Sequence, residues 1–180
     1  MKSKQILETR TKLDMTIGRY WNILYSENLM YNNTGLKRNY DMKKILESIQ
    51  NMAIDRVSVK LDSIAVNMGL KSRKDFSKDS AYPVIYMLAE LNEQYVKLSK
   101  VRTINPIMKQ KYGKKNLVMN EVLTASFIKG LREKLQNQMT ALEKKLTEFN
   151  ERDFDTNGAY LFLTYGQEDK VSKAISKVAV

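Results

Sequence analysis

The chain has 180 residues with a formal net charge of +11, from 31 lysines and arginines against 20 acidic residues. It contains no histidine and no cysteine. No side chain therefore has an ordinary pKa near neutrality, and there is no thiolate nucleophile, soft metal ligand or disulfide. These absences remove the commonest routes to catalysis, so we expect a non-enzymatic protein without a cofactor or a bound metal.

The composition predicts one helical domain spanning residues 1–180. Only two prolines and seven glycines occur, too few for many short strands joined by tight turns. No run of about 18 apolar residues is present, and the basic start lacks the apolar core of a secretory signal. We therefore expect no membrane association and a cytoplasmic or virion location.

Two long helices are predicted in the first part of the chain. The first runs from about Lys4 to Met30, with apolar positions at Ile6, Leu13, Ile17, Tyr20, Trp21 and Leu24. Asp41 is a good N-cap for the second, which runs from about Met42 to Met68. Gly69 suits the position just past the end of this helix. The apolar positions of the helix lie on one face: Met42, Leu46, Ile49, Ala53, Val57, Leu61, Ile64 and Met68.

A third helix is predicted from Asp79 or Ser80, with Pro83 in its first turn, and it ends before Pro106. Its apolar stripe alternates steps of four and three: Val84, Leu88, Leu91, Tyr95 and Leu98. The fourth runs from about Ala125 to Glu151 and has the longest apolar face: Ile128, Leu131, Leu135, Met139, Leu142, Leu146 and Phe149. Its carboxylates Glu148 and Glu151 share a face, which we interpret as solvated rather than metal-binding.

Two short runs fit strands better than helices. Asn116–Val122 and Ala159–Tyr165 are β-compatible and bracketed by turn residues, so we predict that they form a small strand pair. A short helix is expected at about Glu168 to Ala179. The fold class is thus all-α, an elongated four-helix bundle of helical hairpins with a minor two-strand element and a short C-terminal helix. Residues 1–102 form a three-helix part, and residues 116–180 form a strand–helix–strand–helix part.

The stretch from Lys115 to Asp155 resembles the C-terminal end of the septicolysin-like family of small helical proteins. In that family, as here, a short strand-like run leads into one long helix that ends near an asparagine, here Asn150. The preceding order, a helical hairpin and then a third helix, is similar as well. The chain departs from the family pattern because no tryptophan follows Asn150 and about 25 more residues continue. The resemblance implies an oligomeric helical protein and carries no functional residue across.

The densest run of positive charge lies between Glu93 and Glu121, where no acidic residue occurs. In an up-down bundle the first and third connections share one end, which brings further lysines close to it. Such a basic pole with an interleaved tyrosine is suited to nucleic-acid phosphates and bases. The residues are Lys37, Arg38, Lys43, Lys44, Lys97, Lys100, Arg102, Lys109, Lys111, Tyr112, Lys114 and Lys115. A solvated, lysine-rich loop is the simpler alternative.

Three aromatic residues are candidates for partner binding. Trp21 and Tyr25 lie on the first helix, where packing in the core is the first interpretation. Phe76 lies in the charged connection Lys71–Ser80, where it either docks on the domain or contacts a partner.

Together these features favour a structural or interaction protein that oligomerises or docks into a larger assembly. A phage or mobile-element particle component is one instance, because the richness in Asn, Lys, Tyr, Ile and Met suggests A/T-rich coding DNA. The alternatives are a basic nucleic-acid-binding accessory protein and a small inhibitor that binds a host protein.

Overall fold

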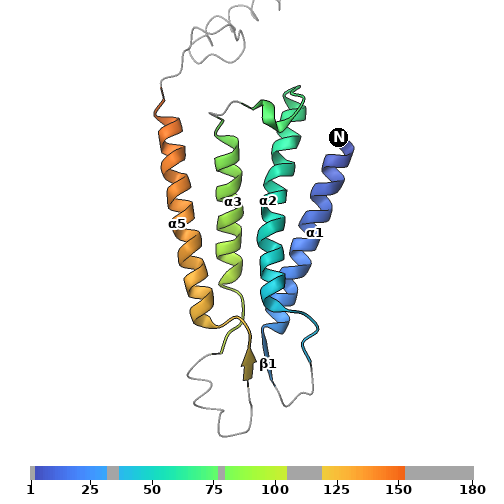
Figure 1. Ribbon diagram of the computed structural model, residues 1–180, viewed down its shortest axis with the longest axis vertical. Helices are drawn as coiled ribbons and strands as arrows, with labels where there is room; N and C mark the ends of the chain where they lie inside the picture. The colour runs from blue at the N-terminus through green and yellow to red at the C-terminus, as the bar shows by residue number, and fades with distance from the viewer. Residues whose placement is uncertain (1–2, 32–36, 77–79, 105–118, 153–180) are drawn as a thin grey trace, which may run out of the picture. The chain divides into compact units, whose positions relative to one another are not determined.

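The computed structural model describes residues 3–31, 37–76, 80–104 and 119–152 (Figure 1). By its contacts the chain divides into two compact units, Met1–Phe149 and Asn150–Val180, and the description below concerns the first. The elements follow in the order α1 (Ser3–Glu27), β1 (Leu29–Tyr31), α2 (Met42–Asn67), the 3-10 turn η2 (Arg73–Asp75), α3 (Tyr82–Leu98), β2 (Met119–Glu121) and α5 (Ala125–Asn150). The predicted all-α class with a minor two-strand element is confirmed.

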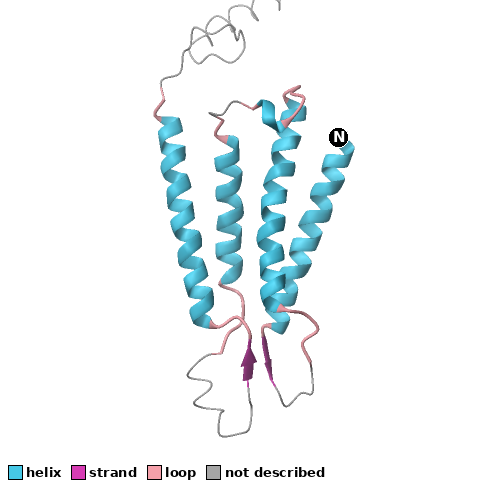
Figure 2. Cartoon of the chain, viewed as in Figure 1, coloured by secondary structure: helices cyan, strands magenta, loops and turns pink. Residues whose placement is uncertain are grey.

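The four long helices alternate in direction and lie alongside one another (Figure 2). The pair α1 and α2 has the most extensive contact, and α3 packs next to α2. The described helices include none with the length and apolar character needed to cross a membrane.

The ends of the helices follow the predicted local rules. The carboxylate of Asp41 caps α2 by accepting hydrogen bonds from the backbone N–H groups of Lys43 at 2.9 Å and Lys44 at 3.2 Å. Gly69 has φ +71° just beyond α2, the left-handed conformation that a residue with a Cβ rarely adopts. Pro83 lies in the first turn of α3, as predicted.

The strand pairing differs from the predicted one. β2 lies within the predicted run Asn116–Val122, but it pairs antiparallel with β1, with Leu29 opposite Glu121 and Tyr31 opposite Met119. The first helix was expected to continue to Met30, yet α1 ends at Glu27 because the chain turns into this pairing. The run Ala159–Tyr165 and the helix expected at 168–179 lie outside the described residues.

Asn28 explains why the chain leaves the helix at this point. Its side chain is fully buried and bonds only to backbone groups from distant segments. The Nδ2 atom donates to the carbonyls of Arg102 at 2.8 Å and Leu123 at 2.9 Å, and Oδ1 accepts from the N–H of Leu123 at 2.7 Å. Asn28 thus ties the end of α1 to the segments after α3 and before α5.

Most of the hydrophobic core lies at this strand end. It combines the second half of α1, the first half of α2, the end of α3 and the first half of α5. Its buried members are Ile17, Trp21, Leu24, Met42, Ile45, Leu46, Ile49, Leu98, Val101, Leu123, Ile128 and Leu135. The core therefore fixes all four helices at one end.

Candidate functional site

The helix α3 buries polar residues and leaves apolar ones exposed. It is the most apolar of the four helices, yet its buried residues are Glu90, Gln94 and Leu98. Of the predicted apolar stripe, Leu98 is buried, Leu91 and Tyr95 are half-buried against the core, and Val84 and Leu88 are half-buried. The helix is rotated so that its polar side faces α2.

The rotation of α3 is set by a network of charges. The buried guanidinium of Arg56 on α2 donates from Nε to Oε2 of Glu90 at 2.9 Å and from Nη1 to Oδ1 of Asp14 on α1 at 3.0 Å. Its Nη2 atom donates to the carboxylates of Glu90 and Glu93. Lys60 supplies a second cation, donating to Oε1 of Glu90 at 2.8 Å. Three helices are thus linked through one arginine.

The network favours the charged forms of Arg56 and Glu93. Burial by itself would lower the pKa of Arg56, but the hydrogen bonds that it donates to Glu90 and Asp14 outweigh this effect, so its pKa is raised above the ordinary value. Burial by itself would raise the pKa of Glu93, but the hydrogen bond from Lys97 and the charge of Arg56 outweigh it and lower the pKa. Because these charges are paired with one another, the arrangement joins helices rather than offering a free acid or base.

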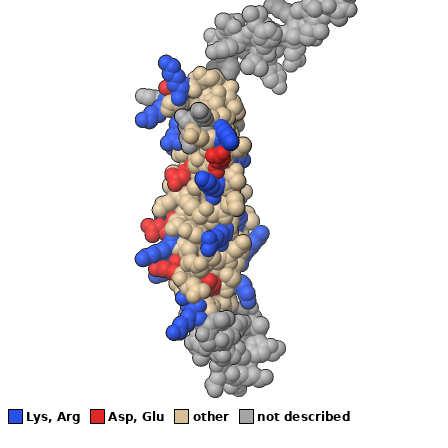
Figure 3. Space-filling view, turned by 90° about the vertical axis from the view of Figure 1, so that its right-hand side faces the viewer, with Lys and Arg blue, Asp and Glu red and all other residues tan. Residues whose placement is uncertain are grey.

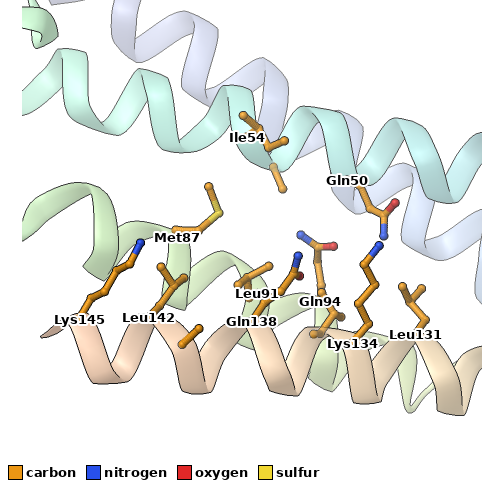
Figure 4. Close-up of a pocket in the computed structure, with 13 residues that line it drawn as sticks. Gln50, Ile54, Met87, Leu91, Gln94, Leu131, Lys134, Gln138, Leu142 and Lys145 are labelled. Carbon is orange, nitrogen blue, oxygen red and sulfur yellow. The ribbon is translucent and has the colours of Figure 1, made fainter. Parts of the chain in front are cut away.

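A groove of about 530 Å³ lies between α2, α3 and α5 (Figure 4). Side chains from all three helices point into it, and its apolar lining includes Ile54, Met87, Leu91, Leu131, Leu135 and Leu142. Ile54 on α2 lines the groove and is 54% exposed. An open apolar groove between helices is a common place for a ligand or a partner helix.

The polar groups of the groove are of two kinds. Gln50, Gln94 and Gln138 supply amides, and Lys134 and Lys145 are its only charged residues among the described residues that line it. Both lysines belong to α5 (Figure 4). The groove therefore carries positive charge without a matching carboxylate.

On its other side, α5 contacts α3 through a cation–π pair. The guanidinium of Arg132 lies 4.2 Å from the centre of the Tyr95 ring. The Nε atom of Arg132 is buried and has no hydrogen-bond partner within the described part of the chain. The contact between α3 and α5 thus combines charge and aromatic stacking with half-buried aliphatic side chains.

The structure divides the predicted basic residues into three groups. Lys109, Lys111, Tyr112, Lys114 and Lys115 lie outside the described residues. Exposed side chains near the strand end belong to Lys37, Lys43, Lys44, Lys100 and Arg102.

Arg38 and Lys97 form the third group, because both make contacts within the fold. Arg38 donates from Nε to the carbonyl of Glu27 at 2.9 Å and from Nη2 to that of Asn28 at 3.0 Å, and it also reaches the carbonyl of Asn120. This contact brings the first and third connections to one end, as the bundle topology predicts. Lys97 pairs with Glu93.

Positive charge is also found away from the strand end. On the side that carries α1, lysines and arginines are interspersed with carboxylates along the visible surface (Figure 3). The charge of +11 is therefore not confined to one pole.

The aromatic candidates have different environments. Trp21 is 2% exposed and belongs to the core, which leaves no ring surface for a partner. Tyr25 stacks on it with ring centres 6.0 Å apart, and its hydroxyl donates to the carbonyl of Lys97 at 3.3 Å. Phe76 is half-buried with its ring 6.1 Å from that of Tyr82, so it docks on the start of α3.

Neither the Arg56 network nor the groove was predicted from the sequence. One signal was present in the sequence. Glu90 and Gln94 are four positions apart on α3, so they share a polar face next to the apolar stripe. The glutamates of α3 and the arginine of α2 are separated by about 34 residues, so the sequence did not show that they meet. Glu148 and Glu151 are exposed, and no three potential metal-binding side chains converge in the described ranges.

No family model matches the sequence, and no curated protein or solved structure is significantly similar to it. The resemblance to the septicolysin-like family therefore stays a prediction.

Proposed function

We propose that this protein is a non-enzymatic structural or interaction protein that assembles with copies of itself or docks into a larger complex. The observation that carries the proposal is the burial pattern of α3, which buries Glu90 and Gln94 while Ile85 and Val96 are exposed. A helix that is apolar over most of its circumference is normally covered on all those sides. A cytoplasmic complex or a virion would supply that cover.

The outward side of α3 has a defined apolar stripe. Ile85, Ala89 and Val96 are spaced by four and seven positions, which places them on one face. Ile85 is 42% exposed and Val96 is 47% exposed. This face, which we call the α3 outer stripe, lies opposite the buried Glu90 and Gln94. Removing such side chains from water by association is favourable by about 25 cal/mol per Å² of apolar area.

Light scattering coupled to size-exclusion chromatography tests the proposal. We expect a discrete multimer at both low and high salt, because apolar contacts are not weakened by screening. The double variant Ile85→Gln/Val96→Gln is expected to elute as a smaller species. The matched control is Leu7→Gln/Met15→Gln on α1, where the side chains are 63% and 71% exposed but lie on another helix. A monomeric wild-type protein, or an equal effect of both pairs, would contradict the α3 outer stripe as the interface.

Nucleic-acid binding is the second candidate function. It is favoured by the two connections that meet at the strand end, where Lys43, Lys44, Lys100 and Arg102 have exposed side chains. A plot of the logarithm of the DNA-binding constant against the logarithm of the salt concentration would then have a slope of about −0.9 for each phosphate contacted. Lys43→Glu/Lys44→Glu is expected to reduce this slope, whereas Lys129→Glu/Lys144→Glu on α5 is the control. Binding that is absent or insensitive to salt would remove this candidate.

A further inference from the structure

The groove between α2, α3 and α5 is as long as a short helix. Its lining on α5 extends from Leu131 to Lys145, about 21 Å at 1.5 Å per residue, or four helical turns. In a four-helix bundle each helix packs against two neighbours. Here α1 packs extensively on α2 and contributes no lining residue, so the position between α2 and α5 stays open.

The charges of the groove indicate what kind of helix would fit. Lys134 and Lys145 are eleven positions apart, about three turns, so they lie along one edge of α5. Between them the lining includes Leu142 on α5 and Leu91 on α3, beside the amide of Gln138. An apolar stripe would fit the centre of the groove, and carboxylates three turns apart would meet the two ammonium groups.

We infer that the groove binds an amphipathic helix of another protein, with an apolar face and acidic residues along its edge. A second copy of this chain is a poor match, because α5 itself carries five lysines and arginines against three glutamates. This inference deepens the proposed function and rests on it, since it names a partner for one surface of the same assembly.

Synthetic helical peptides test the inference on the full-length protein. The probe is a fluorescein-labelled 18-residue peptide with leucines at helical spacing and glutamates on both edges. A second peptide replaces each glutamate with lysine, and a third has the acidic composition in scrambled order. Fluorescence anisotropy is expected to show at least tenfold tighter binding of the acidic amphipathic peptide than of either other peptide.

Two sets of variants locate the binding. Ile54→Glu places a carboxylate in the groove, and we expect it to weaken binding at least tenfold. Val66→Glu is its control, because Val66 is 40% exposed on the same helix and does not line the groove. The double variant Lys134→Glu/Lys145→Glu is expected to bind the lysine peptide more tightly than the acidic peptide. The control Lys129→Glu/Lys144→Glu is expected to keep the preference for the acidic peptide.

The outcomes separate this inference from the proposed function. Equal binding of the acidic and basic peptides, or unchanged binding to Ile54→Glu, overturns the groove as an acidic-helix site. The light-scattering result decides the proposed self-assembly independently. A multimer that does not bind the acidic peptide supports the assembly proposal and contradicts the groove inference. A monomer that binds the acidic peptide supports the groove inference and contradicts self-assembly.

Discussion

The strand end and the middle of α3 are held in opposite ways. At the strand end, large apolar side chains of the helices are fully enclosed, as for Leu24, Ile49 and Leu98. In the middle of α3 the contact with α2 is a charge network around Arg56. The apolar side chains of α3 in this middle part, such as Ile85, Leu88 and Leu91, are half-buried or exposed.

The apolar core and the charge network contribute differently: the core stabilises the fold, and the network orients α3. An apolar core is non-directional, so it stabilises the helices wherever they are brought together. A charge network requires particular partners in particular positions, and its net contribution to stability is small when all partners are present. The network can therefore fix the rotation of α3 while its apolar side chains remain available to another chain.

Removing the centre of the network should have the largest effect. Arg56→Ala leaves the carboxylate of Glu90, which is 1% exposed, with Lys60 as its remaining ion-pair partner. We expect the free energy of unfolding to fall by about 3–5 kcal/mol in urea denaturation. Amide exchange should accelerate most in α3, since α1 and α2 keep their apolar contacts.

The control for this change is an exposed ion pair. Arg73 and Asp62 are 3.1 Å apart with side chains 42% and 30% exposed. Arg73→Ala is expected to cost less than about 1 kcal/mol because solvent screens the pair. A similar loss in both variants would show that the burial of the Arg56 network does not matter.

Aliphatic truncations compare the two regions directly. Leu24→Ala at the strand end creates a cavity, and we expect a loss of about 2–5 kcal/mol. Ile54→Ala in the groove removes a side chain that is already 54% exposed, so the loss should stay within about 0.5 kcal/mol. Chemical denaturation of both variants measures the contrast. A large loss at Ile54 would mean that the groove is closed in solution.

The buried amide at the strand end should have an intermediate effect. Asn28→Ala removes hydrogen bonds to the carbonyls of Arg102 and Leu123 and from the N–H of Leu123. Leaving these backbone groups unpaired is expected to cost about 1–3 kcal/mol. Asn22→Ala on the exposed side of α1 is the matched control, and it should have little effect on the unfolding midpoint.

Local sequence signals predicted the helices well. The cap at Asp41, the left-handed Gly69 and the start of α5 at Ala125 all follow rules that act within one or two turns. The end of α1 was predicted three residues too late, because Leu29–Tyr31 has a partner about 90 residues further along the chain. Pairing over that distance leaves no local trace in the sequence.

The orientation of α3 was the harder problem. Its apolar stripe is regular, so periodicity predicts Leu91 and Tyr95 inside together with Leu98, and both are half-buried against the core. In the structure α3 is rotated so that Glu90 faces α2, because the guanidinium of Arg56 on α2 is buried there and pairs with the Glu90 carboxylate. Hydrophobic periodicity alone does not detect a buried ion pair, and the groove beside it has no sequence signature at all.

Acid should weaken the network by a small amount. In the folded protein the pKa of Glu93 is below its ordinary value of 4.5. Burial alone would raise this pKa, but the interactions of the carboxylate with Lys97 and Arg56 lower it by more. The folded state therefore binds fewer protons than the unfolded state in this range. The stabilisation by Glu93 is complete above about pH 4.5 and is lost as the pH falls through the lower pKa of the folded state.

The variant Glu93→Gln isolates this contribution. Its free energy of unfolding should lie below that of the wild type at pH 7, and the gap should narrow when the pH is lowered from 5 to 3. Glu133→Gln is the control, because Glu133 is 65% exposed and 3.9 Å from Lys129. A gap that stays constant over this range would show that Glu93 acts through its shape rather than its charge, because only a charged side chain responds to protonation.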